Sequence, residues 1–454
     1  MSIFKVCDIR GVYGTELTDD TAERLGRAVG ARLAGEAVAV GGDLRPSTTA
    51  LKAALIAGLR RGGAGVVDLG RVPTPAFYFG RTRAGARGGI MVTASHNPPR
   101  DNGFKVVLGD LPITPEELQA LAAEMAALPA VGAAGVIGTG DTPDQNEEIM
   151  AAYADSLVAA FPDLRPRRVV VDAGHGSMWQ VAPEVLRRLG QEVVELFCTP
   201  DGTFPGRDPN PSVPEHLAAL RRAVSEHGAD LGVAYDGDGD RAIFVDERGR
   251  VAAADRAFVL LVRQMLPGEP GASVVYDLKS SVAVPEAIIA GGGRPFMERS
   301  GHAFIKRRMI QEHALLAGEI SGHYFFRTVG GDDPLYATGL MLRALDAQGR
   351  SMAAAMDTVP AYPISPDIRL PCPAPRAAEI QAQVLAAFSD HPIDTLDGVR
   401  ITFAEGWALV RTSVTEPLLT LRFEAHTQAA LRAIQRQVRG AAPLLAALWP
   451  ADPA

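Results

Sequence analysis

The sequence predicts an α/β fold, with three similar α/β domains built on mixed sheets and a smaller C-terminal α+β domain. Three observations lead to this prediction. The chain has 454 residues, and at about 150 residues per domain this length allows three or four hydrophobic cores. A β-α-β pattern occurs three times along the chain. Near the C-terminus the pattern changes, because apolar strands follow one another there without helices between them.

Each copy of the β-α-β pattern has a short apolar run, a turn with glycine or serine, a helical stretch and a second apolar run. Parallel strands need such crossovers, and strands that are covered on both faces are apolar throughout. The three copies span residues 38–70, 169–197 and 273–298. They predict three domains of one kind.

The last part of the chain carries the apolar runs ITF, WALVRTS and LLTLRFEA, and a polar-faced helix follows them at about residues 428–439. Three segments are typical of linkers because they are rich in glycine, turn residues or proline: residues 132–148, 247–251 and 360–375. We therefore expect four domains, over residues 1–149, 150–251, 252–365 and 366–454.

The composition argues against nucleic acid and membranes as partners. Lys and Arg number 45 against 53 Asp and Glu, a net charge of −8, and the basic residues form no block. Cys7, Cys198 and Cys372 lie too far apart for a C-x-x-C site, and their odd number argues against a disulfide framework. The start MSIFKVCDIRG lacks the apolar core of a signal peptide. We expect a cytoplasmic protein.

The segment AYDGDGDR is the strongest local signal. Asp236, Asp238 and Asp240 alternate with two glycines directly after the apolar run LGVA, and the glycines let the backbone bend until the carboxylates converge. Two like charges ~4 Å apart repel by about 4 kcal/mol at an effective dielectric constant of 20, so three carboxylates call for a cation. Oxygen ligands indicate a hard metal, Mg²⁺ before Ca²⁺.

Two other interpretations of this segment stay open from spacing alone. Glu247 occupies the twelfth position counted from Asp236, where an EF-hand has its last ligand. However, residues 241–246 read RAIFVD, an apolar strand where a calcium loop would place polar ligands. The segment could also be a solvated acidic turn without a metal.

A second segment, GGIMVTASHNPPRDNGFKV, leads from an apolar strand into Ser95, His96 and Asn97. A hydroxyl at such a strand exit can act as a nucleophile or carry a phosphoryl group. His96 and Lys105 could protonate or neutralise what arrives there. Taken alone, however, Ser-His-Asn-Pro favours an ordinary turn closed by side-chain-to-backbone hydrogen bonds.

Two further segments could bind a sugar phosphate. VRTSVTEP offers Arg411, Ser413 and Thr415, a guanidinium and two hydroxyls that suit a dianionic phosphate; a plain β-turn explains it as well. AGEISGHYFF places Glu319, Ser321 and His323 between apolar runs. Its carboxylate and hydroxyl can hold vicinal sugar hydroxyls by paired hydrogen bonds. A capped turn with a buried histidine is the alternative there.

All four segments occur in the order and approximate spacing of the α-D-phosphohexomutase superfamily, which the chain therefore resembles. DIRG at residues 8–11 and GEISGH at residues 318–323 are similar to the phosphomannomutase/phosphoglucomutase branch. The resemblance implies four domains around a central cleft. Domain by domain, it implies a phosphoserine loop, a metal-binding loop, a sugar-binding loop and a phosphate-binding loop.

The resemblance also implies the site residues. Ser95 would be the phosphorylated residue, and an oxygen on it would join Asp236, Asp238 and Asp240 around Mg²⁺. Arg10, His96 and Lys105 would act beside Ser95 in catalysis. The substrate-binding residues would be Arg241, Arg256, His302, Glu319, Ser321, His323, Arg411, Ser413 and Thr415.

The implied reaction interconverts hexose 1-phosphate and hexose 6-phosphate, with mannose, glucose or both as the sugar. Phosphorylated Ser95 would donate its phosphoryl group to the sugar phosphate. The resulting 1,6-bisphosphate would reorient in the site before its other phosphoryl group returns to Ser95. Glucose 1,6-bisphosphate would therefore serve as activator and intermediate. A mobile fourth domain would let the intermediate turn. Lys105, His302 and His323 are candidates for the general base. The expected partners are small hexose phosphates, and the protein would be a monomer or homodimer.

Three positions depart from that branch: Cys7 replaces a usual tyrosine, Val414 an asparagine or glycine, and Arg299 a common lysine. None of them is the serine or a metal ligand. Residues 201–211, DGTFPGRDPNP, resemble a family loop that we interpret as structural. The alternatives are a phosphoglucosamine mutase, which more often shows DGIRG with GEQSGH, a non-catalytic sugar-phosphate-binding protein and a metal-dependent phosphatase.

Overall fold

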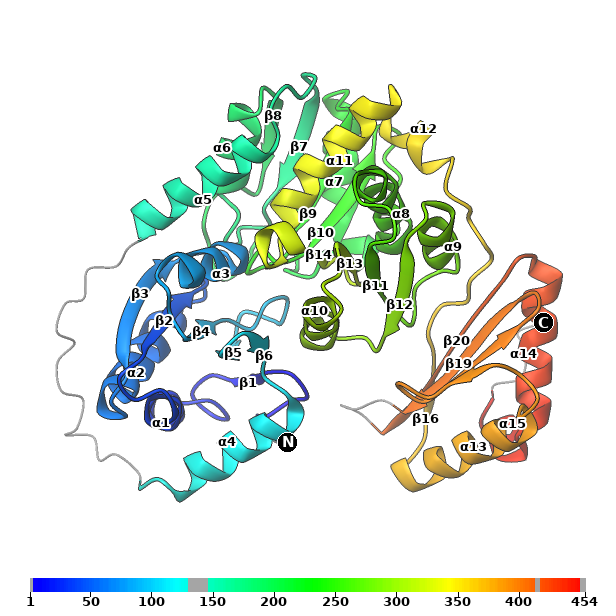
Figure 1. Ribbon diagram of the computed structural model, residues 1–454, viewed down its shortest axis with the longest axis horizontal. Helices are drawn as coiled ribbons and strands as arrows, with labels where there is room; N and C mark the ends of the chain where they lie inside the picture. The colour runs from blue at the N-terminus through cyan, green and yellow to red at the C-terminus, as the bar shows by residue number, and fades with distance from the viewer. Residues whose placement is uncertain (1–2, 130–145, 413–416, 450–454) are drawn as a thin grey trace.

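The computed structural model describes residues 3–129, 146–412 and 417–449 of the chain. Their strands form four separate sheets, and we call each sheet with its helices a domain, numbered in chain order. The domains follow one another in an arch, from the blue first domain to the red end of the fourth (Figure 1). The predicted fold class is confirmed. The predicted boundaries between the domains stay predictions.

The first domain has six strands, in the order β1-β5-β4-β2-β3 with β6 beside β5. β2 is parallel to β3 and β4, whereas β5 is antiparallel to β4 and β1, so the sheet is mixed. The helix expected inside the β-α-β copy at residues 38–70 is present as α2. The elements are β1 (Ile9–Val12), α1 (Asp19–Arg32), β2 (Ala37–Gly42), α2 (Thr48–Arg61), β3 (Gly65–Arg71), α3 (Thr74–Arg83), β4 (Gly88–Val92), β5 (Asp101–Leu108), β6 (Leu111–Pro112) and α4 (Pro115–Ala127).

The second domain has four strands in the order β10-β9-β7-β8, with β10 antiparallel to β9. Its central strands β7 and β9 are buried along most of their length because helices and neighbouring domains cover both faces. The elements are α5 (Asn146–Ala160), β7 (Arg168–Asp172), α6 (Val181–Arg188), β8 (Glu192–Leu196), η2 (Pro214–Leu217), α7 (Ala218–Glu226), β9 (Leu231–Tyr235) and β10 (Ala242–Asp246).

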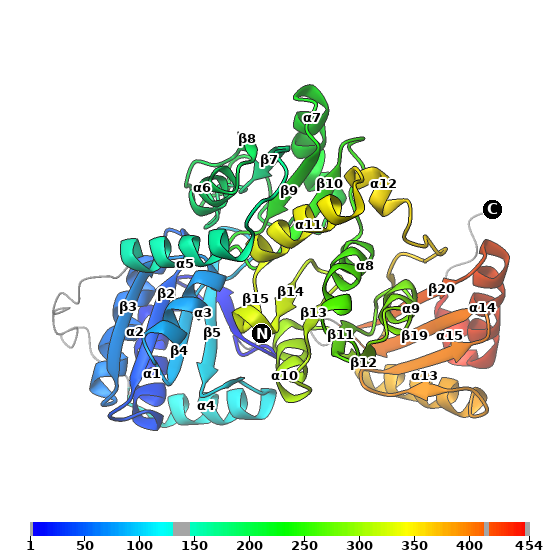
Figure 2. The same cartoon turned by 45° about the horizontal axis from the view of Figure 1, so that its top comes forward.

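The third domain has a mixed sheet in the order β12-β11-β13-β14-β15. Its elements are α8 (Ala254–Met265), η3 (Leu266–Gly268), β11 (Ser273–Asp277), α9 (Ala283–Ala290), β12 (Arg294–Glu298), α10 (His302–Gln311), β13 (Leu316–Gly318), β14 (Tyr324–Phe326), η4 (Arg327–Val329), β15 (Gly331–Asp332), α11 (Pro334–Gln348) and α12 (Met352–Met356). α11 contacts both α5 and α8 and so connects the second and third domains (Figure 2).

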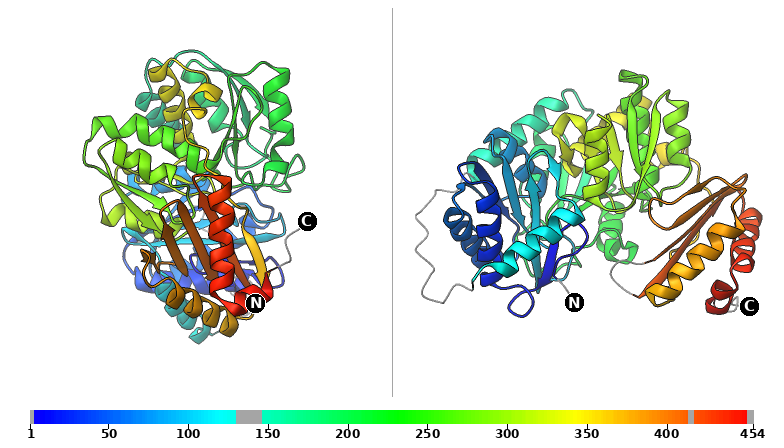
Figure 3. Two further views of the ribbon diagram at one scale, coloured as in Figure 1. Left: turned by 90° about the vertical axis from the view of Figure 1, so that its right-hand side faces the viewer. Right: turned by 60° about the horizontal axis from the view of Figure 1, so that its bottom comes forward.

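The fourth domain has an antiparallel sheet in the order β16-β20-β19-β18-β17, and α13 and α14 pack against it (Figure 3). β16 and the start of α13 lie inside the segment interpreted as a linker, so its C-terminal part was assigned wrongly. The elements are β16 (Ile368–Pro371), α13 (Ala374–Ala387), β17 (Ile393–Asp394), β18 (Val399–Phe403), β19 (Gly406–Thr412), β20 (Leu418–Ala425), α14 (Gln428–Ala441) and α15 (Pro443–Leu448).

The hydrophobic cores connect the domains unequally. One large core runs through the second and third domains and includes α3 and one face of the first sheet. The fourth domain has a core of its own and joins the third through a small cluster of Leu278, Trp407 and Leu409. No helix among the described residues is long and apolar enough to cross a membrane.

Candidate active site

Ser95 lies in a tight turn just after β4 and contacts the second domain. Its Oγ donates a 2.7 Å hydrogen bond to Oδ2 of Asp236, and its backbone N–H donates to the Thr93 hydroxyl. The residue is 1% exposed and has a φ of 49°, in the left-handed region that costs a non-glycine residue about 1 kcal/mol or more. The N–H of Asn97 closes the turn on the Ala94 carbonyl. The segment is thus a turn, and it presents a serine to the aspartates.

The three aspartates of DGDGDR converge at the carboxyl end of β9. Asp236, Asp238 and Asp240 are fully buried, and each offers a carboxylate oxygen, with these atoms all within 4.8 Å of one another. Thr74 of the first domain donates a 2.8 Å bond to Asp238, whose other oxygen, Oδ1, has no hydrogen-bond partner among the described residues. β10 begins directly after the loop, at Ala242, which excludes the EF-hand alternative.

Lys105, on β5, reaches into this cluster from the first domain. Its Nζ lies 2.6 Å from Oδ2 of Asp238 and also bonds Asp240. Burial and repulsion by the neighbouring aspartates raise the pKa of Asp236 to about 8. Burial disfavours the Lys105 ammonium, but Asp238 and Asp240 outweigh it and hold the pKa of the lysine well above its ordinary value. The converging carboxylate oxygens, with Oδ1 of Asp238 left without a hydrogen-bond partner among the described residues, fit a divalent cation.

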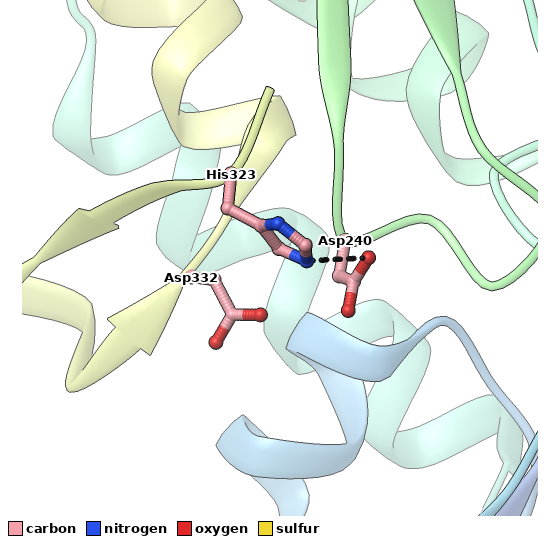
Figure 4. A group of neighbouring side chains, drawn as sticks. All are labelled: Asp240, His323 and Asp332. Atoms are coloured by element: carbon pink, nitrogen blue, oxygen red, sulfur yellow. Dashed lines mark ion pairs between the residues drawn. The ribbon is translucent and has the colours of Figure 1, made fainter. Parts of the chain in front are cut away.

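His323 of the third domain connects the aspartate loop at residues 236–240 to the turn at residues 319–322. Its Nε2 lies 3.2 Å from Oδ1 of Asp240, and its Nδ1 lies 3.1 Å from Glu319 and 2.9 Å from the Ser321 hydroxyl. Figure 4 shows the imidazole directed at Asp240, as the dashed line marks. Burial opposes the charged ring, but Asp240 and Glu319 raise the pKa of His323 to about 9.

A second acidic group shares part of this arrangement. Asp240, His323 and Asp332 also bring ligand atoms within 4.8 Å of one another (Figure 4). Here the Lys306 ammonium lies 3.4 Å from Asp332 and supplies the positive charge that a second ion would bring. Asp236, Asp238 and Asp240 offer carboxylate oxygens alone, which a hard cation prefers, so they are the better candidate for a metal site.

The remaining catalytic candidates surround the Ser95 turn. Arg10 is held by Asp8 at 2.7 Å and donates to the Ala94 carbonyl and the Asn97 side chain. His96 Nδ1 lies 3.3 Å from Ser95 Oγ. The Arg241 guanidinium and burial hold the pKa of His96 well below its ordinary value. Arg241 itself lies 4.0 Å from Asp236.

The comparisons with known proteins agree along most of the chain. Residues 1–131, 151–249 and 253–362 match domains I, II and III of the phosphoglucomutase/phosphomannomutase family, all described as alpha/beta/alpha domains, and residues 368–441 match its C-terminal domain. The chain is 38% identical to a phosphomannomutase/phosphoglucomutase of Pseudomonas aeruginosa. The matched region covers 96% of this chain and 95% of that protein. This chain belongs to the phosphoglucomutase/phosphomannomutase family.

Other members of the phosphoglucomutase/phosphomannomutase family are similar over the same length. A phosphoglucomutase of Neisseria gonorrhoeae is 38% identical, and the match covers 96% of each of the two chains. A phosphomannomutase of Salmonella montevideo is 37% identical, with 94% of this chain and 95% of that protein covered. The crystal structure of a family protein from Burkholderia thailandensis superposes with a TM-score of 0.88 at 36% identity, over 97% of this chain and 96% of that one.

Some predicted residues of this family member stand apart from the serine and the aspartates. Arg411 pairs with Asp397 inside the fourth domain, at 2.9 Å. Arg256 donates to the carbonyls of Met356, the last residue of α12, and of Val359 beyond it. Ser413 and Thr415 lie outside the described residues, as does Val414. The described contacts thus leave the phosphate-binding part of the prediction untested.

His302 and Cys7 face the junction between the first and third domains. Together with Lys105 they line a cavity of about 60 Å³. The His302 ring stacks 5.8 Å from that of His323, and burial, with Lys105 nearby, lowers its pKa to about 4. Burial raises the pKa of the Cys7 thiol to about 12, so Cys7 stays protonated and weakly reactive at neutral pH.

Sequence reasoning missed several residues that hold the loops. Asp277, at the end of β11, accepts hydrogen bonds from Ser300 and the Lys279 N–H, and burial and Glu319 raise its pKa to about 6. Asp277 ends β11 on the third sheet just as Asp172 ends β7 on the second, so the carboxyl end of an apolar strand was the available signal. Arg45 is fully buried beneath the Ser95 turn. In the sequence Arg45 belongs to an ordinary β-α turn, and no pattern indicated that it would be buried.

Proposed function

We propose that this protein is a phosphohexomutase that interconverts hexose 1-phosphates and hexose 6-phosphates through phosphorylated Ser95 and a 1,6-bisphosphate. One observation carries the proposal. The hydroxyl of Ser95 lies 2.7 Å from Asp236, within a group of buried carboxylates that fits a divalent cation. The turn at Ser95 therefore places a group that can carry phosphate against ligands for the ion that phosphoryl transfer requires.

Mg²⁺ is the ion we propose, because the donors are all carboxylate oxygens. Asp236, Asp238 and Asp240 would hold it, and when bound it would neutralise charge on the transferring phosphoryl group. The chain adds its own positive charges beside the serine. Arg10 is fixed in place by Asp8 and Asn97, and Lys105 by the aspartates, so both can stabilise developing charge without reorganising.

The three candidates for the general base differ in charge. Lys105 is paired with two carboxylates, and His323 is held protonated between Asp240 and Glu319. His302 is kept neutral by burial, and its Nε2 has no hydrogen-bond partner among the described residues. A base must be unprotonated before it acts, so this difference supports His302 as the base and His323 as a proton donor.

Substrate recognition would involve the third and fourth domains. Glu319 and Ser321 are held against His323 and can accept and donate bonds to sugar hydroxyls. Arg411, with Ser413 and Thr415, would hold the phosphate that is not being transferred. Because the bisphosphate must present each end to Ser95 in turn, these groups have to accept both orientations. Opening of the fourth domain would allow that reorientation.

Intact-mass measurement tests the proposal. After incubation with glucose 1,6-bisphosphate and Mg²⁺, the protein should retain one phosphate, and Ser95→Ala should retain none. The same preparation should interconvert glucose 1-phosphate and glucose 6-phosphate. Unphosphorylated wild-type protein without isomer interconversion would contradict the proposal and favour a sugar-phosphate-binding protein, whereas steady release of inorganic phosphate would favour a phosphatase.

The sugar preference needs a direct comparison. Relatives of similar identity are named phosphoglucomutase, phosphomannomutase or both. Glucose and mannose differ only at C2, so both offer the same other hydroxyls to Glu319 and Ser321. Turnover of mannose 1-phosphate, glucose 1-phosphate and glucosamine 1-phosphate should favour one or both of the first two. Faster turnover of the amino sugar would select the phosphoglucosamine mutase alternative. The cytoplasmic location and the oligomeric state stay predictions.

A further inference from the structure

Arg45 is buried completely under the Ser95 turn and uses every donor that it has. Its Nη2 donates to the carbonyls of Ser95 at 2.8 Å and Asn97 at 2.6 Å. Its Nη1 donates to the carbonyls of Pro98 at 2.6 Å and Asp101 at 2.9 Å, and its Nε donates to Asp43. A guanidinium has five N–H groups in a rigid fork, so this set fixes both edges of the turn at once.

Arg45 also holds the backbone of Ser95, the residue that is proposed to react. Ser95 has a φ of 49°, which a serine adopts only where its surroundings impose it. The carbonyl of Ser95 is fixed by Arg45, and its N–H is fixed by Thr93. With both neighbouring peptide groups fixed, the Cα–Cβ bond points toward Asp236. The arginine therefore controls where the hydroxyl lies without touching it.

The loop at residues 201–211 closes over Arg45 from the second domain. The Phe204 ring lies 5.2 Å from the Arg45 guanidinium carbon, a cation–π distance. A Cβ on Gly202 would come within 2.1 Å of the Leu44 carbonyl oxygen, so the loop backbone lies directly against the chain beside Arg45. The segment that the sequence marked as structural thus covers the support of the serine turn.

The same loop also supports the metal loop. Its Arg207 is paired with Asp172 at 2.8 Å and donates at 2.6 Å to the carbonyl of Tyr235, the residue before Asp236. A Cβ on Gly237 would come within 2.6 Å of the Ser95 carbonyl oxygen, so the two loops touch backbone to backbone. One segment therefore contacts the supports of both reacting groups.

We propose that Arg45, covered by Phe204, is a positioning residue for phosphoryl transfer that keeps the Ser95 hydroxyl aligned with the three aspartates. The proposal rests on the proposed function of Ser95 as the carrier of the phosphoryl group. Arg45 acts through the Ser95 backbone, so its loss alters the transfer step and leaves the binding of sugar phosphates unchanged. The substrate groups of the third and fourth domains have no described contact with Arg45.

Arg45→Lys tests this role, because lysine keeps the charge but cannot span four carbonyls. We expect kcat to fall about 100-fold, the effect of a displacement of about 1 Å in an aligned reaction, with KM changed less than about threefold. Single-turnover phosphorylation of the enzyme by glucose 1,6-bisphosphate should slow by the same factor. Arg343→Lys is the matched control, since Arg343 also combines a carbonyl bond, to Ala160, with a ring, that of Phe161.

Phe204→Leu provides a second variant that leaves every hydrogen bond of the serine turn in place, and it decides the matter if Arg45→Lys does not fold. We expect kcat and the single-turnover rate to fall about tenfold at unchanged KM. Wild-type transfer rates in a folded Arg45→Lys or in Phe204→Leu would overturn the proposal, as would an equal loss in Arg343→Lys. If wild-type protein acquires no phosphate on Ser95, the proposed function fails instead, so the two failures are distinguishable.

Discussion

The junction between the first and second domains and the junction between the third and fourth are built differently. At the former, Ser95, Thr74 and Lys105 reach across to buried aspartates, and one hydrophobic core continues from α3 into the second sheet. At the latter, Leu278 packs on Trp407 and Leu409. Polar contacts border this cluster, among them those from Arg400 to the Leu278 carbonyl, from the Val282 N–H to Glu424 and from Lys279 to Asp367.

This difference separates the two tasks of the protein. Relative motion of domains is the default unless their interface is large and apolar. The proposed chemistry lies at the extensive junction, where displacement would be costly. The groups proposed to grip the distal phosphate lie on the domain that has the small junction. A bisphosphate intermediate that must reorient needs a serine in a fixed position and phosphate-binding groups on a domain that can move.

Asp238→Asn should have the largest effect, because it removes charge from the centre of the rigid junction. We expect kcat to fall about 10³-fold or more, with no change of fold by circular dichroism. Steady-state kinetics with glucose 1-phosphate at saturating Mg²⁺ measure this. Asp346→Asn, which removes an ion pair with Arg167 on another surface, is the control and should leave kcat unchanged. A fall of tenfold or less for Asp238→Asn would contradict the metal assignment.

Trp407→Ala should loosen the small junction. Trp407 is fully buried, its Nε1 donates to Glu424 at 2.6 Å, and its truncation should cost about 3 kcal/mol. Hydrogen exchange should rise in the fourth domain, while Ser95 is still phosphorylated at the wild-type rate. Leu445→Ala is the control, because Leu445 lies in the core of the same domain away from the junction. It distinguishes a weakened junction from a general loss of stability of the fourth domain. Loss of Ser95 phosphorylation in Trp407→Ala alone would mean that the two junctions are not independent.

Arg411→Lys tests the grip without disturbing the chemistry. Lysine keeps the charge but loses the bidentate fork, so KM for glucose 1-phosphate should rise about tenfold while kcat changes little. Arg369→Lys, on β16 of the same domain, serves as the control. An unchanged KM would exclude Arg411 from phosphate binding.

The smallest expected effect is on the pH dependence of stability, through His302, which lies near Lys105 at the junction between the first and third domains. Burial holds His302 neutral with a pKa of about 4, below the value of about 6.5 in an unfolded chain. The stability tied to the neutral ring is therefore complete above about pH 6.5 and is lost as pH falls toward 4, by about 1 kcal/mol at pH 5.5. Urea unfolding of wild type and His302→Asn at pH 5.5 and 7.5 measures the difference, and an identical pH slope in both would disprove it.

The sequence predicted the parts of this molecule whose signal is local. The apolar run before Asp236 and the helix of α2 depend on neighbouring residues, so both were predictable. The assignment of residues 360–375 as a linker was wrong for β16, because a strand at the edge of a sheet tolerates flanking prolines. α13 was missed because Ile380, Val384 and Leu385 are its large apolar residues and most of the others are alanine, which gives a weak helical pattern.

The site contacts depended on positions in space that no local pattern encodes. Lys105 and Asp240 are 135 positions apart in the chain, and Arg45 and Ser95 are 50 apart. Resemblance to a family supplied the roles of the aspartates and the serine. The support beneath the serine had no such signal, because a buried arginine and a surface arginine look the same in a sequence.

The hydrogen bond between Ser95 and Asp236 spans 141 positions of the chain, which has a consequence during synthesis. At about 5–20 residues per second, the turn leaves the ribosome several seconds or more before the aspartate that it meets. The first domain can condense around its own hydrophobic core in that interval. A ribosome-bound chain thus displays a serine that has no partner for chemistry, and enzymatic competence begins only once the DGDGDR segment has emerged and docked.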